Sequence, residues 1–164
     1  MDYFTKENIT FILALIGSIG TIAGWVYAFI TTRKNIGIRV VAYSIKGSNI
    51  LLYLSFENKS RLTISITDLA IKIGEFYHPC RHVPQRVVST QRYTGSQLVS
   101  SVDYYNIQMP IELGSLGSTS GYVLFVLPKG HRISDTNVLT FQVSSNRGRA
   151  IEMKLSLDQA METL

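Results

Sequence analysis

The most constraining feature of this sequence is an uncharged, largely apolar run near its N-terminus. Residues 9–30 contain no Asp, Glu, Lys or Arg. At a rise of about 1.5 Å per residue, a helix of this length covers the roughly 30 Å of hydrocarbon in a bilayer. The run therefore predicts one membrane-spanning helix over residues 9–30, between a short N-terminal tail (1–8) and a basic juxtamembrane linker (31–36).

The charges beside this run predict its orientation. Three cations follow the run closely: Arg33, Lys34 and Arg39. Because cytoplasmic segments carry the excess of Lys and Arg, we expect a single-pass protein of the cell membrane with its N-terminus outside and its C-terminal domain in the cytoplasm. The single cysteine, Cys80, excludes an intrachain disulfide and also favours a reducing compartment. A cleaved signal peptide is the alternative, but the run is too long for a signal-peptide core and its leading segment is not basic.

Small residues share one face of the predicted helix. They recur at spacings of three and four: Gly17, Gly20, Gly24 and Ala28. Such a face lets two helices approach closely, which predicts self-association or pairing with another membrane protein. Glycine is also common in membrane helices without this role, so both interpretations stay open.

Period-two patterns dominate the rest of the chain and predict a β domain over residues 37–157, followed by a C-terminal tail (158–164). Leu52, Leu54 and Phe56 alternate with more polar neighbours, as in a strand with one buried face. The apolar series then shifts by one residue between Ile66 and Leu69, which predicts a β-bulge there. About seven to nine short antiparallel strands favour an all-β, immunoglobulin-like sandwich, with a small barrel as the alternative.

Two later segments carry further structural predictions. Residues 122–127 are apolar on both faces, which predicts a central strand. Asn146, Arg147 and Gly148 predict a turn between two apolar strands, with Gly148 suited to the left-handed position of a hairpin. Residues 76–103 lack a clear period, so the sequence does not indicate whether this region is ordered.

Several turn and strand patterns also resemble those of known proteins. They are Phe56–Arg61 followed by Ile64–Thr67, then Met109–Leu113 and Ser145–Arg149. The chain resembles short uncharacterised bacterial proteins, some from prophages, that join an N-terminal membrane helix to a β-sandwich. The resemblance spans nearly the whole chain and implies this architecture, but it brings no activity with it.

One constellation indicates metal chemistry. His78, Cys80 and His82 alternate, so an extended strand would present all three on one face and offer nitrogen and sulfur to zinc. Structural zinc sites usually close with four ligands, and His131 is the remaining histidine in the sequence. A zinc enzyme or sensor at this site is an alternative function. The competing interpretation is incidental histidines beside a packed cysteine, and our expectation is that no cofactor is bound.

Residues 76–103 are the best candidate for binding a partner. This region has no acidic residue between Glu75 and Asp103. Its basic and aromatic side chains, with those that follow directly, form the predicted partner-binding set: Arg81, Arg86, Arg92, Tyr93, Tyr104 and Tyr105. Arg and Tyr are enriched at interface hot spots, which favours a protein partner. The alternative is a solvated loop whose arginines keep the protein soluble.

No sequence motif indicates catalysis. Thr119 stands where a nucleophile elbow requires serine, and no lysine follows the glycines as a phosphate loop requires. The net charge of +5 is mild and does not indicate nucleic-acid binding. We therefore expect a non-enzymatic, membrane-anchored binding module, with assembly of oligomers through the glycine face of the helix as a further alternative.

Overall fold

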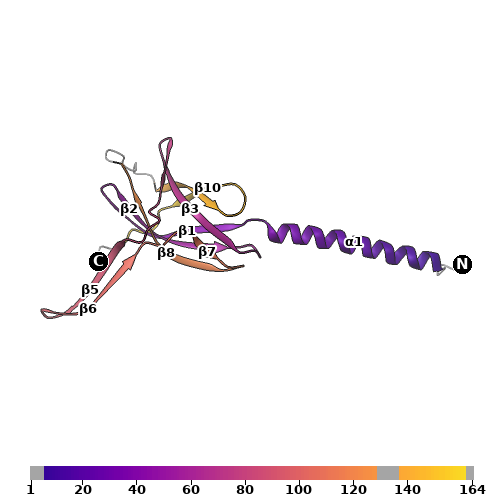
Figure 1. Cartoon of the computed structure of the whole chain (residues 1–164), viewed down its shortest axis with the longest axis horizontal. Coiled ribbons are helices and arrows are strands. Elements are labelled where there is room, and N and C mark those ends of the chain that lie inside the picture. Colours follow the sequence, from indigo (N-terminus) through magenta and orange to yellow (C-terminus); the bar gives the residue numbers. More distant parts are fainter. Residues whose placement is uncertain (1–5, 129–136, 162–164) are drawn as a thin grey trace. The chain divides into compact units, whose positions relative to one another are not determined.

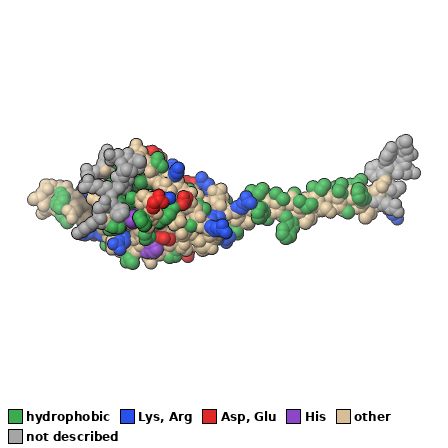
Figure 2. Space-filling model, turned by 90° about the horizontal axis from the view of Figure 1, so that it is seen from above, with side chains coloured by type: hydrophobic (Ala, Val, Ile, Leu, Met, Phe, Trp, Pro, Cys, Tyr) green, Lys and Arg blue, Asp and Glu red, His purple; other side chains and the backbone are tan. Residues whose placement is uncertain are grey.

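The structure is a computed structural model that describes residues 6–128 and 137–161. The chain divides into a helical unit that ends at Arg33 and a β unit that begins at Lys34. In the helical unit, α1 runs over Lys6–Thr32. Its Asn8–Thr32 segment has a mean hydropathy of 2.0, and no residue of its most apolar stretch is buried within the chain. Figure 2 shows hydrophobic side chains along this helix. Among the described residues, the structure therefore contains one helix long and apolar enough to cross a membrane.

The polar side chains inside α1 find their partners within the helix itself. The hydroxyls of Thr10, Ser18 and Thr21 each donate to the carbonyl oxygen four residues earlier, at 2.8–2.9 Å. A hydroxyl without such a partner is costly in an apolar environment, and this local bond removes the cost. The helix thus presents few unsatisfied polar groups along its apolar length.

The β unit contains ten strands in the part of the chain that the structure describes (Figure 1). They are β1 (Ile36–Lys46), β2 (Asn49–Asn58), β3 (Ile64–Ile73), β4 (Phe76–Pro79), β5 (Arg86–Thr94), β6 (Gln97–Tyr105), β7 (Ile111–Leu113), β8 (Ser118–Val126), β9 (Val138–Ser145) and β10 (Ile151–Ser156). This number exceeds the predicted seven to nine. The shortest strands are β4, with four residues, and β7, with three, and a strand as short as β4 carries little period-two signal of its own.

The strands form antiparallel sheets. One sheet has the order β1-β2-β8, and a second has the order β10-β9-β3-β4, with β7 also paired to β3. β4 pairs with the end of β3 at Ala70–Ile73, whereas β7 pairs with its beginning at Ile64–Ile66. The third sheet is the hairpin β5-β6 alone. The prediction of an antiparallel, mostly β domain is confirmed.

The two larger sheets share one hydrophobic core. In β2, Ile50, Leu52, Leu54 and Phe56 are fully buried and alternate with less buried residues, as the sequence pattern predicts. The aromatic rings of Phe125 in β8 and Phe141 in β9 meet edge to face with their centroids 6.1 Å apart. Each such fully buried side chain contributes roughly 1.5–3 kcal/mol. Residues of both sheets therefore contribute to one buried core.

Two local features follow the sequence pattern closely. The β3–β9 register shifts between Ile66 and Asp68, so the predicted bulge is confirmed. At the β9–β10 turn, Gly148 has a φ of 65°, which confirms its left-handed position. A side chain at that position would cost about 1–2 kcal/mol, which explains the glycine.

The prediction of a central strand at residues 122–127 is wrong. β8 lies at the end of its sheet order and pairs only with β2 among the named strands. Two segments nevertheless cover its outer edge, since the Arg81 amide donates to the Leu124 carbonyl (2.8 Å) and the Ile107 amide donates to the Tyr122 carbonyl (2.7 Å). An edge strand covered in this way has the same apolar pattern as a central strand.

Candidate functional site

The β5–β6 hairpin projects from the rest of the β unit (Figure 1). Its strands are joined by a two-residue turn in which Gly95 has a φ of 62°, as such tight turns require. Every residue of β6 is exposed. Large apolar side chains with 43–60% exposure run from the base of the hairpin to its tip: Tyr93, Leu98, Val99, Val102, Tyr104 and Tyr105. Within the described chain, β6 is therefore left largely uncovered.

A buried asparagine holds the two ends of the hairpin together. Asn106, only 3% exposed, donates from its side-chain amide to the carbonyls of Arg81 (2.9 Å) and Val83 (3.2 Å). Its side-chain oxygen accepts from the Gln85 amide, and its own backbone amide donates to the Gln85 carbonyl (3.1 Å). We call residues 80–85 and 106–107 the neck, because the chain leaves and returns to the β8 edge there. Asn106 therefore fixes the base of the hairpin.

Tyrosine rings pack at this base. Tyr122 of β8 contacts Tyr104 of β6 with ring centroids 6.0 Å apart and Tyr53 of β2 with centroids 4.8 Å apart. Burial, and then the neighbouring Tyr53 and Tyr104 hydroxyls, raise the pKa of Tyr122 above its ordinary value. These surroundings therefore favour the neutral phenol. Packing at Tyr104 thus orders the base, while the rest of the hairpin extends beyond it.

One ion pair lies across the two strands. Arg86 Nη1 is 3.4 Å from Asp103 Oδ2, and both side chains remain substantially exposed. A hydrogen bond from Ser89, and then Arg86, lower the pKa of Asp103 below its ordinary value. Exposed pairs of this kind contribute little to stability. Asp103 does, however, neutralise one of the arginines predicted to bind a partner.

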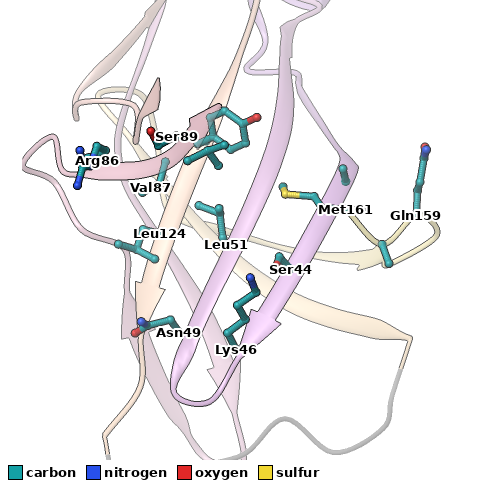
Figure 3. A pocket seen from close by; sticks show the side chains of 14 residues that line it. Ser44, Lys46, Asn49, Leu51, Arg86, Val87, Ser89, Leu124, Gln159 and Met161 are labelled. Atoms are coloured by element: carbon teal, nitrogen blue, oxygen red, sulfur yellow. The ribbon is translucent and has the colours of Figure 1, made fainter. Parts of the chain in front are cut away.

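A groove of about 670 Å³ lies beside the base of the hairpin (Figure 3). Leu51 and Leu124 on the β1-β2-β8 sheet and Val87 of β5 give it apolar walls, and Lys46 and Arg86 give it charge. The C-terminal segment closes one side, because the Met161 amide donates to the Tyr43 carbonyl at 2.7 Å. The groove is partly open to solvent, and the side chains of Lys46 and Arg86 lie apart in it (Figure 3).

The structure spreads the six predicted partner-binding residues along the hairpin. Arg81 lies in the neck, Arg86 pairs with Tyr105 near the base, and Arg92 pairs with Ser100 close to the tip. At about 3.3 Å per residue, the base and tip positions are about 20 Å apart. The predicted set therefore forms an exposed strip rather than a single cluster. Within this set, the Tyr104 ring faces the β unit, where it contacts Tyr122.

The predicted metal ligands are only partly brought together. Ligand atoms of Asp68, Cys80 and His82 lie within 4.8 Å of one another, and among the residues that the structure describes His78 does not belong to this group. The reason is spacing, because residues four apart on an extended strand are about 13 Å apart and cannot share one ion. Asp68 enters because the Cys80 amide donates to the carbonyl of Leu69 beside the bulge (2.8 Å). His131 lies outside the described residues.

This cluster has one buried and two accessible members. Asp68 Oδ1 lies 2.9 Å from His82 Nε2 and also accepts from the Leu69 amide at 2.8 Å. Burial raises the pKa of the Cys80 thiol to about 11, so it is protonated without a bound cation. Sequence spacing alone missed Asp68, and no periodic signal points to Asn106. The sequence feature that lies next to Asp68 is the predicted bulge, which the structure confirms.

Within a single chain, nothing covers the small-residue face of α1, and Arg33 lies at the end of this helix. A Cβ added at Gly17, Gly20 or Gly24 would meet nothing within 4 Å, so the face that ends at Ala28 is open. At the end of the helix, the Arg33 guanidinium lies over the Phe29 ring, 4.6 Å from its centroid.

The other two flanking cations belong to the β unit. Lys34 Nζ donates to the Arg149 carbonyl at 2.9 Å, and desolvation lowers the pKa of Lys34. Arg39 is an exposed residue of β1.

Neither a protein-family model nor a curated protein sequence matches this chain. The resemblance to membrane-anchored bacterial and prophage proteins therefore stays a prediction.

Proposed function

We propose that this protein is a non-enzymatic binding module, anchored by α1 in the cell membrane, that engages a protein partner through the β5–β6 hairpin. The observation that carries the proposal is the exposure of every residue of β6 in a projecting hairpin. A two-stranded hairpin is marginally stable in water on its own. The β5–β6 hairpin nevertheless has nine residues in each strand, which supports a binding role for its exposed surface.

The chemistry of the hairpin fits a protein partner. Tyr93, Leu98 and Val99 are 52–60% exposed at the tip, with Arg92 beside them. Aromatic and arginine side chains dominate the energy of protein interfaces, and apolar neighbours exclude water around them. Within the described chain, β5 and β6 have only each other as strand partners. Their outer edges can therefore accept a strand of the partner by main-chain hydrogen bonding.

The proposal includes a membrane location and an orientation. The apolar length of α1 supports a single-pass anchor, which raises the effective concentration of the module near other membrane proteins. The cations after α1 support an N-terminus outside and a cytoplasmic β unit. We further propose that the two packed sheets form a sandwich of the immunoglobulin-like kind, which the shared core supports.

Site-specific photocrosslinking in intact cells tests the proposal. A photoreactive residue at Val99, at the tip of the hairpin, should give a crosslink to a discrete protein. The same residue at Leu116 should not, although Leu116 is also apolar and exposed (67%), because its amide donates to Ser60 beyond the other end of β2.

The specificity of the crosslink provides the control. Replacing Tyr93 and Leu98 by alanine should abolish the Val99 crosslink. Equal crosslinking from Val99 and Leu116, or a Val99 crosslink that survives these replacements, would show that the hairpin is not the interface.

A further inference from the structure

Three side chains with different metal-binding atoms converge at the neck of the hairpin, which contains two of them. Asp68 comes from the bulge in β3, and Cys80 and His82 come from the segment that follows β4. A carboxylate oxygen, a sulfur and an imidazole nitrogen lie within 4.8 Å of one another. This combination is compact, and no part of the proposed partner-binding function uses it.

The spacing of these atoms is within about 1 Å of what a tetrahedral ion requires. Zinc bonds of about 2.0–2.3 Å hold neighbouring ligand atoms about 3.3–3.8 Å apart. Asp68 Oδ1 and His82 Nε2 now share a 2.9 Å contact, so they must separate by less than about 1 Å to admit the ion. Their side chains are 38% and 49% exposed and can turn, whereas Cys80 is buried and provides a fixed point.

We propose that Asp68, Cys80 and His82 form a three-ligand site for Zn²⁺, with water in the fourth position. The sulfur and nitrogen ligands select a transition metal, since Ca²⁺ and Mg²⁺ prefer sites made of oxygen. The solvent exposure of Asp68 and His82 leaves one side of the ion open, as in zinc sites with three protein ligands.

A bound ion would act on the base of the hairpin. It would tie β3 to the segment that contains Arg81, whose carbonyl accepts from Asn106 and whose amide donates to Leu124. The ion therefore stiffens the neck without contacting the exposed strip of β6. This inference does not depend on the proposed partner, and it stands if no partner binds the hairpin.

Cobalt titration of the full-length protein tests the site. The protein is kept reduced in detergent micelles, freed of metal with a chelator, and titrated with Co²⁺, which replaces Zn²⁺ and reports thiolate ligation by a charge-transfer band in the near ultraviolet. We expect one Co²⁺ per chain, a band of this kind, and its loss when Zn²⁺ is added.

Three variants assign the ligands. Cys80→Ser should remove the charge-transfer band, and His82→Ala should weaken Co²⁺ binding at least about 100-fold, since even partners outside the ligand shell are worth about 10–100-fold. His82 is exposed, so its replacement leaves the fold intact even if Cys80→Ser does not. His78→Ala is the matched control and should bind Co²⁺ as the unaltered protein does.

The inference is overturned by any of three results: no charge-transfer band in the unaltered protein, full-strength binding in His82→Ala, or an equal loss in His78→Ala.

Discussion

Replacing Asn106 by alanine should release the base of the β5–β6 hairpin. The substitution removes three side-chain hydrogen bonds, to the Arg81 and Val83 carbonyls and from the Gln85 amide. Each such bond contributes about 0.5–1.5 kcal/mol, so the neck should lose about 2–4 kcal/mol. Asn106 is buried, and for this reason water does not replace the lost partners without further opening.

Hydrogen exchange of the full-length protein in detergent micelles measures this loss directly. The informative amides are those of Arg81 and Ile107, which donate to the outer edge of β8. A loss of 2–4 kcal/mol predicts exchange that is roughly 30-fold to 1,000-fold faster at these two amides. Amides in the middle of β2 should change less, because their opening does not require release of the neck.

Asn58→Ala is the matched control. Asn58 is 2% exposed and donates to the carbonyls of Leu62, Leu113 and Gly114 at 2.7–3.3 Å, so it loses a comparable set of bonds far from the neck. It should accelerate exchange at Ser60 and leave Ile107 unaffected. If Asn106→Ala does not accelerate exchange at Ile107, or Asn58→Ala accelerates it equally, the account of the neck is refuted.

Three further predictions concern single residues. Because the pKa of Tyr122 is raised above 10.0 in the folded protein, its stabilising contribution is complete below pH 10 and is lost as the pH rises through the folded pKa. Tyr122→Phe should therefore remove this part of the pH dependence when the free energy of unfolding is measured by denaturation over an alkaline pH series. Gly121→Val should destabilise the β unit by about 1–3 kcal/mol, because even a Cβ at this position would lie 3.1 Å from Ile107 Cδ1. Urea unfolding measures this loss, and an unchanged midpoint would contradict the predicted steric clash. Gly148→Ala should lower the free energy of unfolding by about 1–2 kcal/mol, because the residue has a positive φ. Gly114→Ala should change it by no more than about 0.5 kcal/mol, because a Cβ at Gly114 meets open space. Equal losses in the two variants would refute the conformational argument.

Local patterns predicted the parts of the fold that depend on one strand at a time. The alternation in β2 follows from one face being buried, and the phase shift between Ile66 and Leu69 locates the bulge because a one-residue slip would turn the whole apolar set outward. The position of β8 in its sheet was not predictable in this way. Its covering segments contribute backbone groups at Arg81 and Ile107, and backbone groups leave no sequence pattern.

The candidate sites depend on pairing between strands, which the sequence does not encode by spacing. Asp68 reaches Cys80 and His82 because β3 and β4 are antiparallel neighbours, whereas the alternation rule selected His78 in its place. Most of the predicted partner-binding residues lie on the projecting hairpin, although the sequence could not show that Arg86 pairs with Asp103. Asn106 was missed because a buried asparagine next to an exposed strand has no periodic signature.

The stability of the hairpin must decrease from its neck to its tip, and this gradient bears on where a partner acts. Near the base, Asn106 and the Tyr104–Tyr122 contact supply interactions beyond the β5–β6 ladder. Near the tip, Tyr93 and Leu98 pair across the strands with their side chains largely exposed. The proposed partner, if it covers the tip, would supply the missing apolar layer where the hairpin is least stable, at the cost of ordering few residues. Binding at the tip should consequently slow exchange there most, while the neck, already held by Asn106, should change little.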